Sequence, residues 1–137
     1  VSESAPAGAC VRLGASLADA GARAGLLVMG DGSAKRTLKA PGYFDERAAP
    51  FDASVEQAVR SGDMTALAAM DAALARDLMA TGRAAWQVLA GALGAGSAGA
   101  RAGVSPGEVL YSDFPYGVSY LVAVLDPAAV PGLGAPA

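Results

Sequence analysis

An unbroken apolar run between two glycines, residues 25–30, is the feature that most constrains the fold of this chain. A short run without polar residues is typical of a strand that is buried on both faces. A helical pattern precedes it, because Leu13 and Leu17 lie one turn apart, and a polar loop follows at residues 31–37. Helix, buried strand and polar loop in this order predict an α/β fold, a mixed sheet flanked by helices.

Further helices are expected in the middle of the chain. Phe51, Val55 and Val59 repeat every four residues, which predicts a helix that opens near Asp52 and ends at residues 61–62. Two short helices should follow, capped by the carboxylates of residues 63 and 71, and the second should run to residue 82. Residues 83–93 are expected to form the last helix, with Trp86 in the core.

Two strands are expected near the end of the sequence, at residues 108–111 and 118–125, where β-branched and aromatic residues gather. Residues 112–117 between them are expected to form a turn or loop, in which Asp113 with the flanking Tyr111 and Tyr116 is interpreted as a hairpin-like turn with aromatic packing. The 137 residues suit one domain. We therefore expect a flexible lead-in at residues 1–10, the α/β domain at 11–126 and a disordered tail rich in Pro, Gly and Ala at 127–137.

The composition narrows the environment and the partners. The formal net charge of −3 argues against nucleic acid, because phosphate binding needs clustered Lys and Arg. Cys10 is the only cysteine, which favours a reducing compartment. No apolar run approaches the roughly 20 residues of a membrane span, and no signal peptide is visible, so we expect a cytoplasmic protein without a membrane partner.

Polar residues follow the predicted strand, at the sheet edge where ligands gather in α/β folds. We expect them to line a pocket, and the candidates are Asp31, Ser33, Lys35, Arg36, Tyr43 and Asp52. Simpler interpretations stay open: Asp31 and Ser33 could cap a tight turn, the basic pair could be a solvated face, and Asp52 could cap its helix.

The chain contains no histidine, which excludes Ser–His–Asp and Cys–His catalysis. A Ser33–Lys35 pair stays formally open as a nucleophile and base, because residues two apart on a strand face the same side. Glu56 and Glu108 have no visible partner at the spacing of a two-carboxylate glycosidase site.

The order of short motifs resembles a known family. The motifs lie at residues 27–33, 40–45, 51–52, 61–63, 78–93 and 116–120. Together they are similar to the C-terminal portion of the class III extradiol dioxygenase (LigB-like) superfamily, and more narrowly to a bacterial branch of it. The resemblance covers residues 24–125 and implies a LigB-like α/β domain that is incomplete at its N-terminal side.

The resemblance implies a specific chemistry. Family members open catechol-type rings with O₂ at a non-haem Fe(II) held by two histidines and a glutamate. A further histidine, the acid–base group, usually follows an Asp-x-Ser segment; Asp31 and Ser33 match that segment, but Ala34 stands where the histidine would be. The iron histidines belong to the N-terminal part of the family's domain, and the segment at residues 82–86, where the glutamate would be sought, holds no Glu. This chain is therefore expected to bind no cofactor unless an upstream segment supplies ligands for Fe(II).

Three functions follow as hypotheses. The first is an extradiol dioxygenase-like protein that lacks or has altered the usual ring-opening activity because Ala34 replaces the histidine. The second is an active dioxygenase whose metal ligands lie in a missing N-terminal segment, and the third is a structural or regulatory subunit. The expected partners are a small aromatic or anionic ligand and either a homo-oligomer or the missing N-terminal half.

Overall fold

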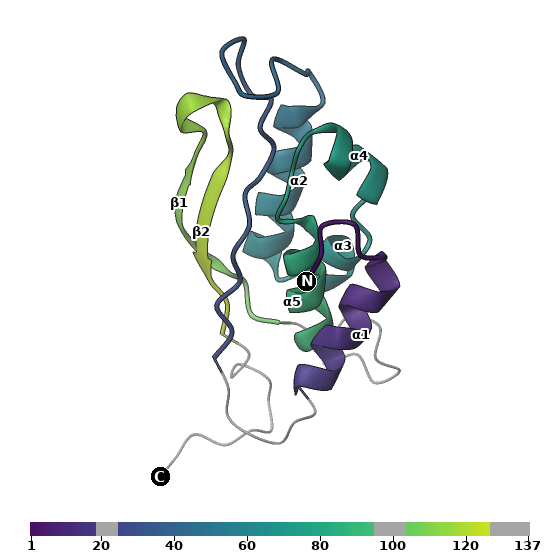
Figure 1. Cartoon of the computed structure of the whole chain (residues 1–137). Helices are drawn as coiled ribbons and strands as arrows, with labels where there is room; N and C mark the ends of the chain where they lie inside the picture. The colour runs from purple at the N-terminus through teal and green to yellow at the C-terminus, as the bar shows by residue number, and fades with distance from the viewer. Residues whose placement is uncertain (19–24, 95–103, 127–137) are drawn as a thin grey trace.

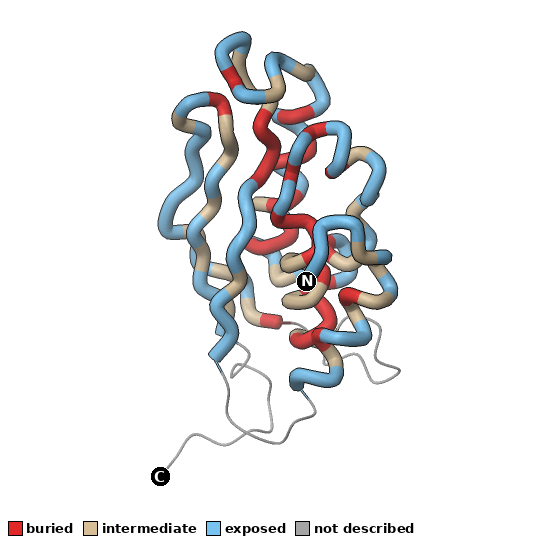
Figure 2. Tube along the Cα trace, in the orientation of Figure 1, coloured by how far each residue is buried: buried red, intermediate tan, exposed pale blue. Residues whose placement is uncertain are grey.

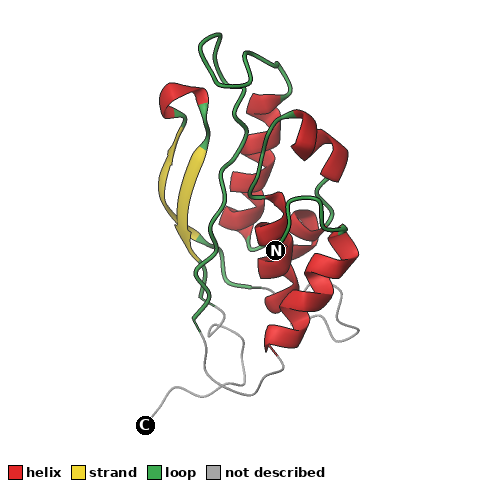
Figure 3. Cartoon of the chain, viewed as in Figure 1, coloured by secondary structure: helices red, strands yellow, loops and turns green. Residues whose placement is uncertain are grey.

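A computed structural model describes residues 1–18, 25–94 and 104–126 as a layer of helices packed against a small β-hairpin (Figures 1 and 3). No helix within these ranges has the length and apolar character needed to cross a membrane. The described elements are α1 Ala7–Ala18, α2 Ala48–Ser61, α3 Met64–Ala68, α4 Ala72–Asp77, α5 Arg83–Ala92, β1 Glu108–Asp113, a 3₁₀ turn at Pro115–Gly117 and β2 Tyr120–Val124.

The hairpin confirms the two late strands. β1 and β2 pair antiparallel, with Ser112 opposite Leu121, and the register shifts by one residue at Leu110. β1 continues two residues beyond the predicted 108–111, whereas β2 is shorter than the predicted 118–125. Leu121 and Ala123 face the helices and pack against their core, so the hairpin is fixed to the helical layer by one face.

Helix α2 provides the central apolar stripe of the core. Phe51, Val55 and Val59 are buried as their spacing predicts, and Gly62 ends the helix with a left-handed φ of 70°. The helix begins at Ala48, four residues before the predicted start at Asp52. Its first turn tolerates a proline at residue 50, because the first backbone N–H groups of a helix have no partner inside it.

The short helices α3 and α4 begin as predicted. The Asp63 side chain accepts the N–H of Ala66, and Asp71 accepts those of Ala73 and Leu74. Helix α4 does not run to Gly82 as expected; it ends at Asp77, and Met79 takes a left-handed φ of 57°. Helix α5, in contrast, lies within the predicted range 83–93.

Helices α1 and α5 approach each other through glycines. A Cβ on Gly14 would lie 1.9 Å from the backbone oxygen of Val88, and one on Gly91 would lie 2.0 Å from that of Val11. No larger residue fits at these two positions without moving a helix. Because the glycines let the helix backbones come so close, this alanine-rich region can pack without many bulky side chains.

The beginning of the chain is tied to α5. Helix α1 begins at Ala7, inside the predicted lead-in of residues 1–10, and the buried Arg83 donates hydrogen bonds to the carbonyl groups of Glu3 and Ala5. The predicted end of the first helix near residue 21, most of the predicted loop at 94–103 and the predicted tail at 127–137 lie outside the described residues.

Residues 25–30 are the main correction to the predicted fold. They are extended but form no strand, and Leu27 and Met29 are 88% and 73% exposed (Figure 2). The prediction of a strand buried on both faces is therefore wrong. In the described part of the chain the only paired strands are β1 and β2, so no neighbouring strand covers this run.

Candidate functional site

Asp52 connects helix α2 to the polar segment that follows residues 25–30. Its Oδ1 accepts the backbone N–H of Ser33 at 2.9 Å, and its Oδ2 accepts the Ser33 hydroxyl at 2.6 Å. The same Oδ2 accepts Nη1 of Arg36 at 3.0 Å, which is also an ion pair. One carboxylate therefore fixes both the backbone and two side chains of this segment to the helix.

The position of Asp52 explains why it needs so many donors. It lies on the buried face of α2, next to Phe51 and one turn before Glu56, and only 8% of its side chain is exposed. A buried carboxylate is costly unless it is hydrogen-bonded and paired. Ser33 is fully buried, and Arg36 supplies the opposite charge, so the cluster is satisfied internally.

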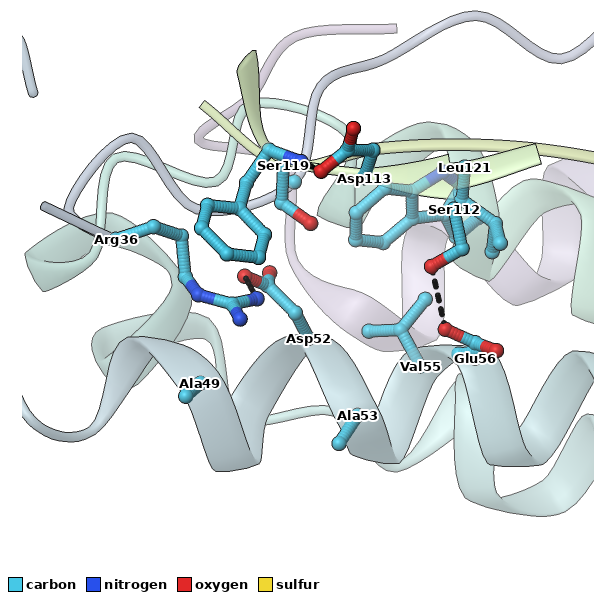
Figure 4. Close-up of a pocket in the computed structure, with 13 residues that line it drawn as sticks. Arg36, Ala49, Asp52, Ala53, Val55, Glu56, Ser112, Asp113, Ser119 and Leu121 are labelled. Atoms are coloured by element: carbon cyan, nitrogen blue, oxygen red, sulfur yellow. Dashed lines mark hydrogen bonds and ion pairs between the residues drawn. The ribbon is translucent and has the colours of Figure 1, made fainter. Parts of the chain in front are cut away.

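A pocket opens beside this cluster, between α2 and the hairpin (Figure 4). Its volume is about 170 Å³. It is lined by Gly32, Arg36, Ala49, Asp52, Ala53, Val55, Glu56, Trp86, Ser112, Asp113, Phe114, Ser119 and Leu121. The helix supplies small and apolar groups, and the hairpin supplies an aromatic ring and hydroxyl groups.

Arg36 is held on two sides at one end of the pocket. Its guanidinium carbon lies 4.2 Å from the centroid of the Phe114 ring, within the range of a cation–π contact, while Nη1 binds Asp52. The planar group is therefore fixed in orientation, and the Phe114 ring is fixed with it.

Glu56 and Ser112 close the other end of the pocket. The Ser112 hydroxyl donates to Oε2 of Glu56 at 2.6 Å, and Arg60 donates to Oε1 at 2.8 Å (Figure 4). Both hydrogen bonds lower the pKa of Glu56 below its ordinary value of 4.5, and the bond from Ser112 has the larger effect. Glu56 therefore stays charged at neutral pH and ties β1 to α2.

The charges at the pocket favour a neutral ligand over an anion. One cation, Arg36, lines it together with three carboxylates, those of Asp52, Glu56 and Asp113. Because Arg36 is paired with Asp52 and Glu56 is paired with Arg60, an incoming anion would meet the negative charge of Asp113 without a free cation among the lining residues.

The structure brings together three of the six candidate residues named from the sequence. Ser33, Arg36 and Asp52 form the cluster, and Ser33 donates to Asp52 rather than to Lys35, so the Ser33–Lys35 pair finds no support. Asp52 binds this segment instead of capping its helix.

The other three candidates do not line the pocket. Asp31 is exposed, Lys35 is partly buried against Gly42, and Tyr43 is 63% exposed with a left-handed φ of 62°. Ala34 is buried, and it too is absent from the lining. Its backbone N–H donates to the carbonyl of Leu78, which fixes it on the side of the turn before α5.

Sequence reasoning missed the hairpin's contribution to the pocket. Trp86 was assigned to the core and is only partly buried, and Phe114 and Ser119 were given no role in a site. Glu56 could have been found, because it lies four residues after Asp52 and therefore on the same helix face. The hairpin residues carried no such signal, since only tertiary packing places them opposite α2.

The residues present do not fit a non-haem iron. In the part of the chain that the structure describes, no three His, Cys, Asp or Glu side chains gather closely enough to hold a metal ion. Two of the pocket's carboxylates are also occupied, Asp52 by Ser33 and Arg36, and Glu56 by Ser112 and Arg60.

Comparison with known proteins adds no relative. No protein-family model, no curated protein and no solved structure matches this chain. The LigB-like resemblance therefore rests on the short sequence motifs, and the pocket is the structural basis for a function.

Proposed function

We propose that this chain is a LigB-like, extradiol dioxygenase-like protein that binds a neutral single-ring aromatic diol without opening the ring. The observation that carries the proposal is the pocket between α2 and the hairpin, with Arg36 fixed between Asp52 and Phe114. The finer fold assignment, a mixed sheet of the LigB-like type, is part of the same proposal.

The size and walls of the pocket support an aromatic ligand. A cavity of about 150 Å³ lined by apolar side chains is enough to hold benzene, and this one has about 170 Å³. Phe114 and Trp86 offer aromatic surface, and Val55 and Leu121 offer aliphatic surface. A single ring fits this volume.

Unused polar atoms support hydroxyl substituents on the ring. Oδ1 of Asp113 accepts the N–H of Phe114 at 2.7 Å. Among the described residues, neither Oδ2 of Asp113 nor the Ser119 hydroxyl has a hydrogen-bond partner. A carboxylate oxygen and a hydroxyl can accept two O–H groups from a neutral diol, whereas the negative surroundings disfavour a ring carboxylate.

The alanine at residue 34 supports the proposal that this chain does not open the ring. An alanine side chain can neither donate nor accept a proton, so residue 34 cannot be the acid–base group. No step is assigned to iron, since the described side chains offer no set of ligands for it.

The test compares catechol with benzoate, which has the same ring and a negative charge. We expect catechol to bind this chain with a Kd in the millimolar range, about −4 kcal/mol, and benzoate about tenfold more weakly. Amide chemical shifts followed by NMR should change at residues 32, 112–114 and 119. Tighter binding of benzoate, or catechol shifts confined to other residues, would contradict the proposal.

Two controls separate the alternatives. Phe114→Ala should weaken catechol binding about tenfold, whereas Phe44→Ala, which removes a half-exposed ring outside the pocket, should not. With Fe(II) added, catechol should cause no O₂ uptake above the rate without protein; uptake that depends on this chain would instead support the active dioxygenase.

A further inference from the structure

A second cavity lies between α2 and the two short helices that follow it, α3 and α4. Its volume is about 250 Å³, compared with about 170 Å³ for the pocket beside Asp52. Four of its lining residues belong to the buried core: Phe51, Val55 and Ala58 of α2 and Leu67 of α3, each no more than 6% exposed. The cavity therefore reaches from the surface into the core of the helical layer.

The break between α3 and α4 leaves this space open. Helix α3 ends at Ala68 and α4 begins at Ala72, so no continuous helix covers this part of α2. Met70 and Leu74 pack against the core but are only partly buried. The lining ends in exposed small side chains, which include Ala66 and Ala69, so a small molecule can reach the apolar walls without unfolding a helix.

The polar groups around the cavity are already bonded. The Ser54 hydroxyl donates to a backbone carbonyl of its own helix at 2.6 Å, and Oδ1 of Asp71 accepts two N–H groups at the start of α4. The carbonyl of Met70 accepts Nε2 of Gln87 at 3.1 Å. Across the described residues, no buried side-chain nitrogen or oxygen lacks a hydrogen-bond partner. A polar ligand group would therefore lose its hydrogen bonds to water in this cavity without replacing them.

We propose that this second cavity binds a small uncharged hydrocarbon, a single ring with a short alkyl chain. An apolar cavity of about 150 Å³ holds benzene, and the additional volume here leaves room for the alkyl chain. Met70 supplies a flexible, unbranched wall that can adapt to the shape of such a ligand. Asp71 places a negative charge at the exposed edge of the lining, which disfavours a carboxylate.

This inference goes beyond the proposed function and does not depend on it. Val55 is the only residue that lines both the second cavity and the pocket beside Asp52. The two sites also differ in chemistry, because the pocket offers a free carboxylate oxygen and a hydroxyl, whereas the second cavity offers apolar walls. A catechol titration that fails leaves the second cavity untouched, and the reverse is also true.

The experiment titrates the whole chain with ethylbenzene and, in parallel, with phenylacetate, which carries a carboxylate on a similar skeleton. We expect ethylbenzene to bind with a Kd of about 1 mM or below, and phenylacetate to bind at least about tenfold more weakly. Ethylbenzene should shift the amide NMR signals of residues 54, 58, 66–70 and 74. No shifts at these residues, or equal binding of phenylacetate, would overturn the proposal.

Matched variants locate the ligand. Ala66→Leu fills part of the cavity from its exposed edge and should weaken ethylbenzene binding at least about tenfold. Ala73→Leu makes the same change at an exposed alanine of α4 outside the lining and should leave binding unchanged. Ala69→Leu fills the cavity from the segment after α3, so the test does not depend on one helix tolerating a leucine. Binding that both lining variants retain would contradict the site.

Discussion

Two adjacent stretches of the chain, residues 25–30 and residues 31–36, have opposite surroundings although neither lies in a helix or a strand. The first is almost wholly apolar and is exposed, with no backbone partner in the described residues. The second is polar, yet Ser33 within it is fully buried and Asp52 fixes it to α2. In this chain, hydrogen-bond partners rather than hydrophobicity therefore decide which of the two segments is buried.

The largest effect should come from removing the anchor of the buried stretch. Asp52→Ala leaves the Arg36 charge, only 18% exposed, and the Ser33 donors without their acceptor, so it should cost about 3–5 kcal/mol of unfolding free energy. Urea unfolding measures it, with Asp77→Ala, a half-exposed ion-pair partner, as the control that should cost less than about 1 kcal/mol. Equal losses in the two variants would contradict the anchoring role.

Removing one donor should have a smaller effect. Ser33→Ala deletes the 2.6 Å hydrogen bond to the Asp52 carboxylate but leaves the backbone N–H and Arg36 in place, so we expect a loss of about 1.5–3 kcal/mol. The matched control is Ser61→Ala, which removes an exposed hydroxyl from α2, the helix that carries Asp52. It should change the free energy of unfolding by less than about 0.5 kcal/mol. A neutral Ser33→Ala would mean that the hydroxyl does not help to hold the segment.

The pocket's other end should respond to acid. Glu56 has a pKa below 4.5 in the folded chain, so its charged form stabilises the fold fully above that pH, and the contribution is lost as pH falls through the lowered pKa. Because Glu56 is partly exposed, Ser112→Ala should cost no more than about 1 kcal/mol at neutral pH. Urea unfolding should show that Ser112→Ala has a lower free energy of unfolding than the unchanged chain at neutral pH, and that this difference disappears in acid. A difference that grows in acid would contradict the lowered pKa of Glu56.

The smallest effect should come from the exposed stretch. Leu27→Ser removes an apolar side chain that packs against little, so stability should change by less than about 0.5 kcal/mol. Leu67→Ser, at a leucine that is 1% exposed in the core, should cost several-fold more in the same thermal unfolding experiment. A comparable loss at the two positions would show that residues 25–30 are packed in solution.

Local signals in the sequence predicted most of the helices and the hairpin. The caps at Asp63 and Asp71 and the end of α2 at Gly62 depend on side chains only a few residues away, so their patterns are readable. The early start of α2 and the early end of α4 were missed. The apolar pattern marks the buried face of a helix but not the turn in which it begins or ends.

The candidate site was predictable only on one side. Ser33, Arg36 and Asp52 were named because polar residues followed an apparent strand, and they do meet, although the strand itself is absent. Phe114 and Ser119 reach the pocket only through packing of the hairpin on α2, and Trp86 reaches it from α5. No spacing in the sequence reveals either arrangement. The exposure of residues 25–30 was missed for the same reason, since burial requires neighbours that a local pattern does not specify.

The most direct test of the contrast between the two stretches is amide hydrogen exchange, measured residue by residue in the chain alone. The amides of Gly32, Ser33, Ala34 and Arg36 donate to Ser119, Asp52, Leu78 and Gly117, so they should exchange slowly. The amides of residues 26–30 have no acceptor in the described residues and should exchange at nearly the rate of an unfolded peptide. Uniform protection across residues 26–36, or faster exchange at residues 32–36 than at 26–30, would contradict the account.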